Sequence, residues 1–150
     1  MTSARNLALR LPAGCIVAAL ALAPTPAEAR DDMAACSPLH QLRIYEVPAQ
    51  NETVFHDRFR DHAARIMARH DFDIVEMWSS RFEDRTEFVY LLRWPDAATM
   101  EARWAQFMAD EEWSAIKAQT AAAHGTFVLD IEERVLCPTD YSPGGIAPAG

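Results

Sequence analysis

The chain has 150 residues, half of which are hydrophobic, and a formal net charge of -8. This length and composition suit one small globular domain with a single core. The acidity argues against a nucleic-acid-binding protein, because the phosphate backbone is bound by basic surfaces.

The N-terminal segment has the pattern of a secretory signal peptide. Arg5 and Arg10 precede the apolar run CIVAALALA (15–23), and an A-x-A cleavage pattern at 27–29 comes after it. We expect cleavage after Ala29 and export to the periplasm or the medium. The apolar run is too short for a spanning helix, which needs roughly 20 residues, so no permanent membrane anchor is expected. An uncleaved N-terminal anchor is the alternative.

The mature chain divides into three parts. Residues 30–37 form a short lead, residues 38–137 form the folded domain, and residues 138–150 form a tail rich in Pro and Gly, which we expect to be disordered. Cys36 and Cys137 flank the folded domain. Because disulfides persist in exported proteins, we predict that these two cysteines are bonded; two free thiols are the alternative.

Residues 40–47 (HQLRIYEV) alternate in the manner of a β-strand. Leu42 and Ile44 lie on one side, which we assign to the core. Arg43 and Tyr45 lie on the other side, which we assign to the open face of the sheet.

A helix is predicted next, with Asn51 or Thr53 as its cap and His70 in its last turn. The apolar positions that recur at helical spacing are Phe55, Phe59, Ala63 and Ile66. At about 100° per residue, His62 projects close to Phe55 and falls within this apolar stripe. We therefore expect His62 to face the core or a cavity, where its charge could change near neutral pH. The alternative is a histidine at the edge of the stripe, hydrogen-bonded to backbone or to a carboxylate.

The rest of the domain predicts a hairpin, two helical segments and a last strand. Residues 73–82 and 86–94 are rich in β-branched and aromatic residues and flank a short polar turn. Asp96 can cap a helix that reaches Met108, and Asp110 can cap a second one that ends at Gly125. Residues 126–136 then predict the last strand.

The order β-α-β-β-α-β predicts a ferredoxin-like α+β fold with a four-stranded antiparallel sheet, its second helical region split in two. In this fold the first and last strands are neighbours. If Cys36 faces Cys137, the register places apolar residues opposite apolar ones and basic residues opposite acidic ones. The pairs it predicts are Leu42–Ile131, Ile44–Leu129, Arg43–Asp130 and His40–Glu133.

Four segments carry a resemblance to a known family: QLRIYEV (41–47), MARHDFD (67–73), MWSS (77–80) and LLRWPDAATMEARWAQFMADEEW (91–113). In their order and spacing they resemble the NIPSNAP family of the dimeric α/β-barrel superfamily. The resemblance implies a homodimer in which the sheets of two ferredoxin-like protomers pack face to face to form a barrel. Asp71 is a departure, because such proteins often have glycine there, which adopts the left-handed conformation more easily.

The residues also indicate a partner for the sheet. Helices cover only one face, and an open face rich in aromatic residues calls for a partner or a ligand in a soluble protein. The residues expected on the open face are Tyr45, Trp78 or Met77, Tyr90 or Leu91, and Trp94 or Arg93.

No metal site is predicted. The helical histidines His56, His62 and His70 are six and eight residues apart, whereas a zinc-binding helix pairs histidines three or four residues apart. A glycine-rich phosphate loop, a nucleophile elbow and a C-x-x-C pair are also missing from the sequence, and no cofactor is predicted.

Three functions stay open. The first is a module that binds a small apolar or aromatic molecule between sheet and helices. The second, implied by the resemblance, is a cofactor-independent monooxygenase or isomerase in which His62, Tyr45 and Arg43 polarise the substrate. The third is a structural or interaction protein. The predicted ligand-binding residues are Tyr45, His62, Trp78, Tyr90, Trp94 and Trp104.

Overall fold

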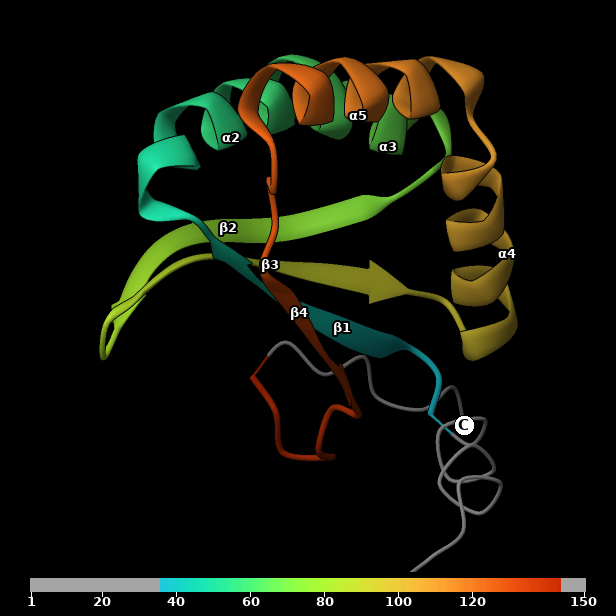
Figure 1. Cartoon of the computed structure of the whole chain (residues 1–150). Coiled ribbons are helices and arrows are strands. Elements are labelled where there is room, and N and C mark those ends of the chain that lie inside the picture. The colour runs from blue at the N-terminus through green and yellow to red at the C-terminus, as the bar shows by residue number, and fades with distance from the viewer. Residues whose placement is uncertain (1–35, 144–150) are drawn as a thin grey trace, which may run out of the picture.

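The structure of the chain, a computed structural model, describes residues 36–143. Four strands form one antiparallel sheet in the order β2-β3-β1-β4. Helices α2, α3 and α5 lie over one face of this sheet, and α4 stands at one end of it (Figure 1). The predicted ferredoxin-like α+β fold is confirmed. The predicted signal peptide and the end of the predicted tail lie outside the described residues.

The bounds of the elements agree closely with the sequence patterns. The strands are β1 (Leu39–Val47), β2 (Asp73–Phe82), β3 (Arg85–Trp94) and β4 (Asp130–Leu136). The helices are η1 (Ala49–Asn51), α2 (Glu52–Arg58), η2 (Phe59–Ala63), α3 (Ala64–Arg69), α4 (Ala97–Met108) and α5 (Glu111–His124). Within residues 36–143, no helix is long and apolar enough to cross a membrane.

A π-helical turn, η2, interrupts the first predicted helix. A π turn holds one more residue than an α turn and so changes the helical phase of the residues after it. Ala63 is 2% exposed and continues the buried stripe after Phe59, whereas His62 is exposed. The expectation that His62 faces the interior is therefore wrong, because it assumed an uninterrupted α-helix.

The helix α3 ends in a Schellman motif built around Asp71. Asp71 has φ 57°, the left-handed conformation that glycine adopts most easily. Its N–H donates to the Ala68 carbonyl at 3.2 Å, and the Phe72 N–H donates to the Met67 carbonyl at 3.1 Å. This turn directs Phe72 into the core, where it is 7% exposed.

The start of the helical region differs from the prediction. The Asn51 side chain makes no capping bond to the helix. Its amide donates instead to the carbonyls of His124 and Thr126, at 3.2 Å and 3.0 Å. These bonds tie the start of the first helical region to the backbone between α5 and β4. The last strand, β4, begins at Asp130 instead of at Thr126.

The predicted register of β1 and β4 is wrong by three residues. Arg43 lies opposite Glu133 instead of Asp130, and His40 lies opposite Leu136 instead of Glu133. Cys36 and Cys137 are bonded as predicted, with their Cα atoms 5.6 Å apart. Both cysteines, however, lie outside the paired segment of the two strands. The disulfide therefore does not set the register of the ladder.

The assignment of faces is also reversed for β1. The residues of β1 that share the helix-covered face are Leu39, Gln41, Arg43, Tyr45 and Val47, and their partners on β3 are Trp94, Leu92, Tyr90, Phe88 and Thr86. Leu42 and Ile44 lie on the open face. Alternation separates the two faces of a strand but does not say which one the helices cover. Tyr45, Tyr90 and Trp94 are therefore absent from the open face, where we expected aromatic residues.

Aromatic side chains fill the space between the sheet and the helices. Phe59 from η2 contacts Phe88 and Tyr90, with ring centroids 4.5 Å and 5.4 Å apart. At the other end of the sheet, Phe72 contacts Trp94 and Trp104 at 4.8 Å and 4.9 Å. The core is therefore a layer of rings with an aromatic group at each end of the sheet.

Candidate functional site

A polar cluster lies between the sheet and the helix layer. Arg43 and Tyr45 come from β1, Tyr90 from β3 and Glu133 from β4, and the registers of these strands place them side by side on one face. Nη2 of Arg43 donates to the Tyr45 hydroxyl at 3.2 Å, and that hydroxyl lies 3.2 Å from the Tyr90 hydroxyl. Arg43 also forms an ion pair with Glu133. We call these four residues the arginine–tyrosine cluster.

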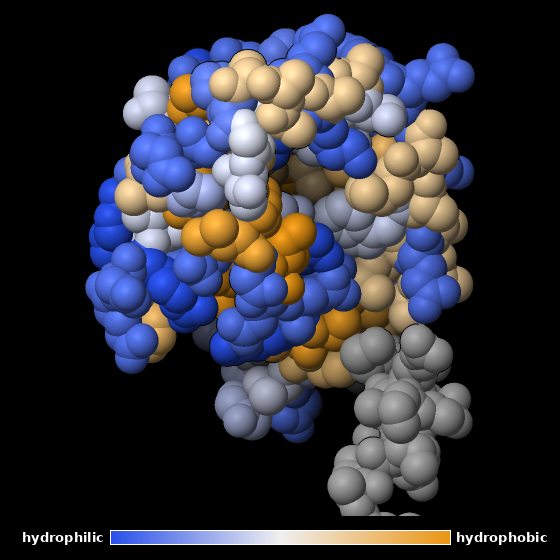
Figure 2. Space-filling view, in the orientation of Figure 1, coloured by the Kyte–Doolittle hydropathy of each residue, from blue (hydrophilic) through white to orange (hydrophobic). Residues whose placement is uncertain are grey.

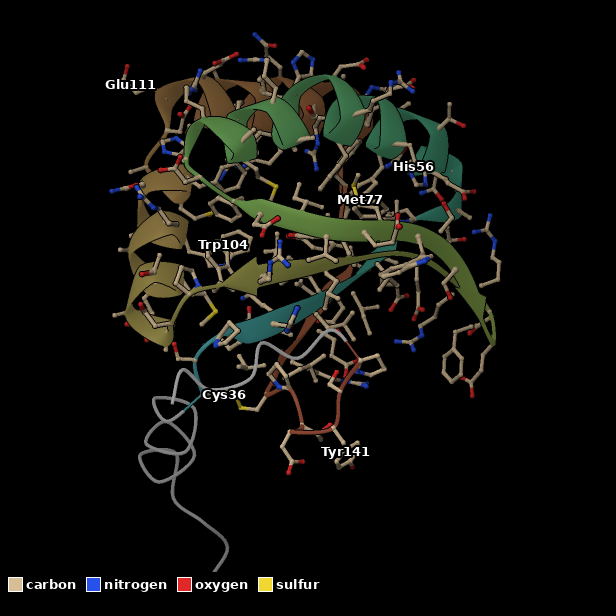
Figure 3. All side chains as sticks on the ribbon, turned by 180° about the vertical axis from the view of Figure 1, so that it is seen from behind. Cys36, His56, Met77, Trp104, Glu111 and Tyr141 are labelled. Atoms are coloured by element: carbon tan, nitrogen blue, oxygen red, sulfur yellow. A yellow bond between two sulfur atoms is a disulfide. The ribbon has the colours of Figure 1, made fainter. Side chains whose placement is uncertain are left out.

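Trp104 and Gln41 connect this cluster to α4. The Arg43 guanidinium carbon lies 4.5 Å from the Trp104 ring centroid, within range of a cation–π contact. Figure 3 shows Trp104 reaching from α4 toward the strands. The buried Gln41 Oε1 accepts from the indole N–H groups of Trp104 and Trp94, at 2.8 Å and 3.1 Å. These bonds fix both tryptophan rings beside the cluster.

Burial and neighbouring charges set the protonation of the cluster. Burial, followed by the neighbouring Tyr45, raises the pKa of Tyr90 well above its usual value. Tyr90 is therefore a neutral hydroxyl at physiological pH. Burial alone would lower the pKa of Arg43, but Tyr45, Tyr90 and Glu133 outweigh it, so the pKa is raised and the guanidinium stays charged.

One donor of the cluster has no partner among the described residues. Nε of Arg43 is buried and makes no hydrogen bond within residues 36–143. Buried polar groups in native proteins are nearly always hydrogen-bonded, so such an atom calls for an explanation. The Arg43 side chain is 13% exposed and Glu133 is 42% exposed, so the cluster reaches solvent on the β4 side.

The surface is hollowed on this side of the molecule. Figure 2 shows a recess beneath α5, between this helix and the strands, with apolar side chains gathered at its margin. In the same orientation, β4 is the edge strand of the sheet nearest the viewer, and the segment between α5 and β4 crosses in front of β2 (Figure 1). The recess therefore lies on the side of the molecule that carries β4, the strand of Glu133.

A second cavity lies at the opposite edge of the sheet, between β2 and the first helices. It measures about 330 Å³. Its lining includes His56, Phe59, Met77, Ser79 and Trp78, the last of which is one of the predicted ligand-binding residues. Ser79 Oγ lies 3.2 Å from Nε2 of His56, a contact between residues 23 apart in sequence that no short motif indicates. A nucleophilic serine also needs a group that orients its base. Among the described residues, the bond to Ser79 is the one hydrogen bond of the His56 ring.

The predicted ligand-binding residues are divided between three places. Tyr45, Tyr90 and Trp104 meet at the cluster, and Trp94 is joined to it through Gln41. His62 lies on the exposed side of the first helical segment. Trp78, opposite Val89, shares the open face of the sheet and is 46% exposed. Fold geometry thus separates His62 and Trp78 from the other predicted residues.

Sequence reasoning missed three residues at the site. Gln41 and Glu133 lie in strands where a polar residue normally indicates a solvated position. Arg58 lies on α2, with its guanidinium carbon 3.9 Å from the centroid of the Phe127 ring. The sequence signal for Gln41 was its place in the alternating first strand, on the same side as Arg43 and Tyr45. The positions of Glu133 and Arg58 could be inferred only with the correct register and the contacts of the last helix.

His70 is the C-cap residue of α3, as its place in the last turn suggests, and its side chain has a second structural role. Its Nε2 lies 2.8 Å from Oδ2 of Asp110, which also accepts from Arg69 at 2.6 Å. Oδ1 of Asp110 accepts from the N–H of Trp113 at 3.0 Å and caps α5. The bonds from His70, Trp113 and Arg69 hold the pKa of the Asp110 carboxyl well below its usual value. Asp110 thus links α3 to α5. Within residues 36–143, no group of three or more His, Cys, Asp and Glu side chains is placed to hold a metal ion.

Comparisons with known proteins agree with the fold. A NIPSNAP family protein from Agrobacterium tumefaciens strain C58 superposes with a TM-score of 0.63 at 17% identity, over 72% of this chain and 99% of that one. An uncharacterized NIPSNAP-like domain protein from Burkholderia xenovorans gives 0.61 at 17% identity, over 71% and 90%. A putative antibiotic biosynthesis monooxygenase from Caulobacter crescentus CB15 gives 0.51 at 12% identity, over 74% and 98%. At these identities the likeness shows a shared fold.

A comparison with curated proteins finds no match. The NIPSNAP family model, in contrast, matches residues 40–143, which reach from the first strand to beyond the last one. The chain therefore belongs to the NIPSNAP family.

Proposed function

We propose that this chain binds a small apolar or aromatic molecule between its sheet and its helices, at the arginine–tyrosine cluster. The observation that carries the proposal is the buried Nε of Arg43, which makes no hydrogen bond among the described residues. A few converging polar groups within aromatic surroundings are typical of ligand pockets. Here the Tyr45 and Tyr90 hydroxyls and the Arg43 guanidinium converge beside Trp104.

The enzymatic alternative has less support from the geometry. The monooxygenase or isomerase hypothesis gave His62 a part in polarising the substrate, and His62 lies on the surface. Tyr90, whose pKa is raised by burial, is a poor proton acceptor at neutral pH. The Caulobacter crescentus protein described as a putative monooxygenase shares the fold, and a shared fold does not carry an activity with it.

A protein with a purely structural or interaction role needs only an apolar core for stability. Burying a guanidinium and two hydroxyls costs stability unless each is well paired. The cluster leaves one guanidinium donor without a partner among residues 36–143. A polar interior of this kind is more easily explained by a ligand than by assembly alone.

The functional form in this proposal is a homodimer whose open sheet faces pack together. The registers of the sheet place Leu42, Ile44, Val89, Leu91 and Trp78 on that face. Trp78 is 46% exposed, and the other four are only partly buried. Arg134 and Glu132 of β4 lie opposite Leu42 and Ile44 and border this group of apolar side chains. An exposed apolar group with a charged border is typical of a protein–protein contact.

Export to the periplasm or the medium completes the proposal. It rests on the signal-peptide pattern of residues 1–29 and is supported by the bond between Cys36 and Cys137. Structural disulfides persist in oxidising compartments and are rare in the cytosol. The exported protein would accordingly bind its ligand outside the cytoplasm.

The proposal is tested with 2-(1-naphthyl)ethanol, a neutral aromatic probe with one hydroxyl, in isothermal titration calorimetry. We expect saturable binding by the wild type. Arg43→Gln should weaken it about five- to tenfold, the equivalent of one hydrogen bond of about 1–1.4 kcal/mol. Arg65→Gln is the matched control, because Arg65 is exposed on α3, away from the open face, and pairs with Glu112. Equal weakening by both variants, or no saturable binding by the wild type, would contradict the proposal.

A further inference from the structure

One arginine of the described chain differs from all the others in its surroundings. Residues 36–143 contain ten arginines, and nine of them have a carboxylate oxygen within 4.0 Å. Arg58 has none among these residues, and its guanidinium makes no hydrogen bond to them. In a strongly acidic chain, a cation without an acidic neighbour is an arrangement that calls for an explanation.

Aromatic rings surround Arg58 instead. Its guanidinium carbon lies 3.9 Å from the ring centroid of Phe127, 5.2 Å from that of Trp113 and 5.7 Å from that of Phe55. Cation–π contacts offset part of the cost of burying the charge. Within residues 36–143 no side chain or carbonyl accepts from the five N–H donors of the guanidinium, and these donors form a fork that matches a carboxylate.

The electrostatics of Arg58 agree with an unneutralised charge. Burial lowers its pKa to about 10, and Tyr45 opposes this shift in part. Arg58 therefore stays charged at neutral pH but is less stable in that form than an arginine in water. An anion bound beside it would restore the lost stabilisation.

Arg58 belongs to the same interior as the arginine–tyrosine cluster. Tyr45 acts on the pKa of both Arg58 and Arg43. The Phe55 ring connects the two arginines, because its centroid lies 6.0 Å from that of Tyr45 and 5.7 Å from the Arg58 guanidinium. A molecule that contacts Tyr45 from the helix side would therefore also come near Arg58.

The charges of this interior differ at its two ends. Glu133 already neutralises Arg43, whereas Arg58 has no acidic partner among the described residues. The nearby Lys117 ammonium lies farther out, 5.9 Å from the Trp113 ring centroid, and is partly exposed. One negative charge on the ligand would thus balance the interior, while a second would have to be desolvated without a buried partner.

We infer that Arg58 binds the carboxylate of the ligand, so that the ligand class is a monocarboxylic acid with an apolar or aromatic body. This inference rests on the proposed function and gives its ligand a charge and an orientation. The carboxylate lies at Arg58, among Phe55, Trp113 and Phe127. The body of the ligand extends toward Tyr45 and Arg43.

The test compares three probes that share a naphthalene ring: 1-naphthaleneacetate, the neutral 2-(1-naphthyl)ethanol and the dianionic 1-naphthyl phosphate. Calorimetry with the wild type should show the acetate binding at least tenfold more tightly than the alcohol. Arg58→Gln should remove this preference and leave the affinity for the alcohol within about twofold. Arg65→Gln is the control, because Arg65 is exposed on α3 and pairs with Glu112.

One further variant and three outcomes keep the inference distinct from the proposed function. Arg58→Lys retains the charge without the fork and should keep part of the preference, even if Arg58→Gln fails to fold. If acetate and alcohol bind the wild type equally, the inference is wrong and the proposed function stands. Tighter binding of the phosphate than of the acetate overturns the single-charge assignment. If no probe binds, both the inference and the proposed function fail.

Discussion

Gln41 shows how one buried polar side chain organises the end of the core. It is 1% exposed, and its Oε1 is the acceptor for the indole N–H groups of Trp94 and Trp104. A buried donor that loses its acceptor keeps its desolvation cost without compensation. Gln41 is therefore a structural residue whose removal should affect both tryptophans.

We predict that Gln41→Leu lowers the free energy of unfolding by about 2–4 kcal/mol, since it leaves two buried indole donors without an acceptor. Urea denaturation at pH 7 measures this change. Gln106→Leu, at an exposed position on α4, should stay within about 0.5 kcal/mol of the wild type. A loss below about 1 kcal/mol for Gln41→Leu would show that water replaces the missing acceptor.

Asp110 predicts a dependence of stability on pH. The pKa of its carboxyl is lowered in the folded state by His70, the Trp113 N–H and Arg69. A lowered folded pKa means that the stabilisation is present above the unfolded carboxyl pKa, about 3.9, and is lost as pH falls toward the folded value. Asp110→Asn should therefore be less stable than the wild type at pH 7, and the difference should shrink at pH 3.

Thermal unfolding at the two pH values measures this difference. Asp96→Asn is the matched control, because Asp96 caps α4 through Thr99 at 2.7 Å and forms no ion pair with a described residue. The stability difference between Asp96→Asn and the wild type should change less between pH 7 and pH 3 than the difference for Asp110→Asn. If the stability difference between Asp110→Asn and the wild type is the same at pH 7 and pH 3, the ionised Asp110 carboxyl does not stabilise the fold in the way we infer.

At the scale of elements, the π turn η2 decides which side chains of the first helical region are buried. It places Ala63, 2% exposed, against the core and leaves His62 in solvent. Ala63→Leu should therefore cost about 1–3 kcal/mol through overpacking. His62→Ala should change stability by less than about 0.5 kcal/mol. Chemical denaturation measures both, and a larger cost for His62→Ala than for Ala63→Leu would contradict the phase of the helix.

The positions of the first three strands were predicted correctly from sequence patterns, whereas the register of β1 with β4 was not. Alternation correctly located β1, and β-branched and aromatic residues correctly located β2 and β3. The caps Asp96 and Asp110 fixed the starts of α4 and α5. The register of β1 with β4 was predicted from the cysteines and failed, because Cys36 and Cys137 are bonded outside the paired segment of the two strands. The face covered by helices is set by tertiary packing and not by the alternation itself.

The same limits apply to the candidate site. Arg43, Tyr45 and Tyr90 were singled out as residues of the open sheet face, and the structure places them on the covered face instead. Arg58 could not be singled out, because its importance comes from a missing acidic neighbour among the described residues and from rings of α2, α5 and the segment before β4. His62 was selected by helical phase alone, and the π turn changed that phase.

At the scale of the whole molecule, the open face of the sheet determines the predicted assembly. Leu42 and Leu91 lie opposite each other at the middle of this face. We expect the wild type to be a dimer at micromolar concentration and Leu42→Arg to be a monomer, because a charge would be buried in an apolar interface. Size-exclusion chromatography with light scattering measures both masses.

Ala68→Arg controls for the added charge, because Ala68 is exposed on α3 and lies on the helix side of the molecule. This variant should remain a dimer. A monomeric mass for the wild type at tens of micromolar, or a dimeric Leu42→Arg, would contradict the face-to-face arrangement. The assembly and the ligand site lie on opposite faces of the sheet, so the two proposals can fail separately.

The position of the ligand is tested most directly by nuclear magnetic resonance, because each of the four tryptophans gives one indole N–H signal. During titration with 2-(1-naphthyl)ethanol, the signal of Trp104, which contacts Arg43, should shift most. The signal of Trp78, on the open face, should stay in place. Shifts confined to Trp78, which lines the separate cavity beside β2, or no shift of any indole signal at saturating probe, would contradict a binding site at the arginine–tyrosine cluster.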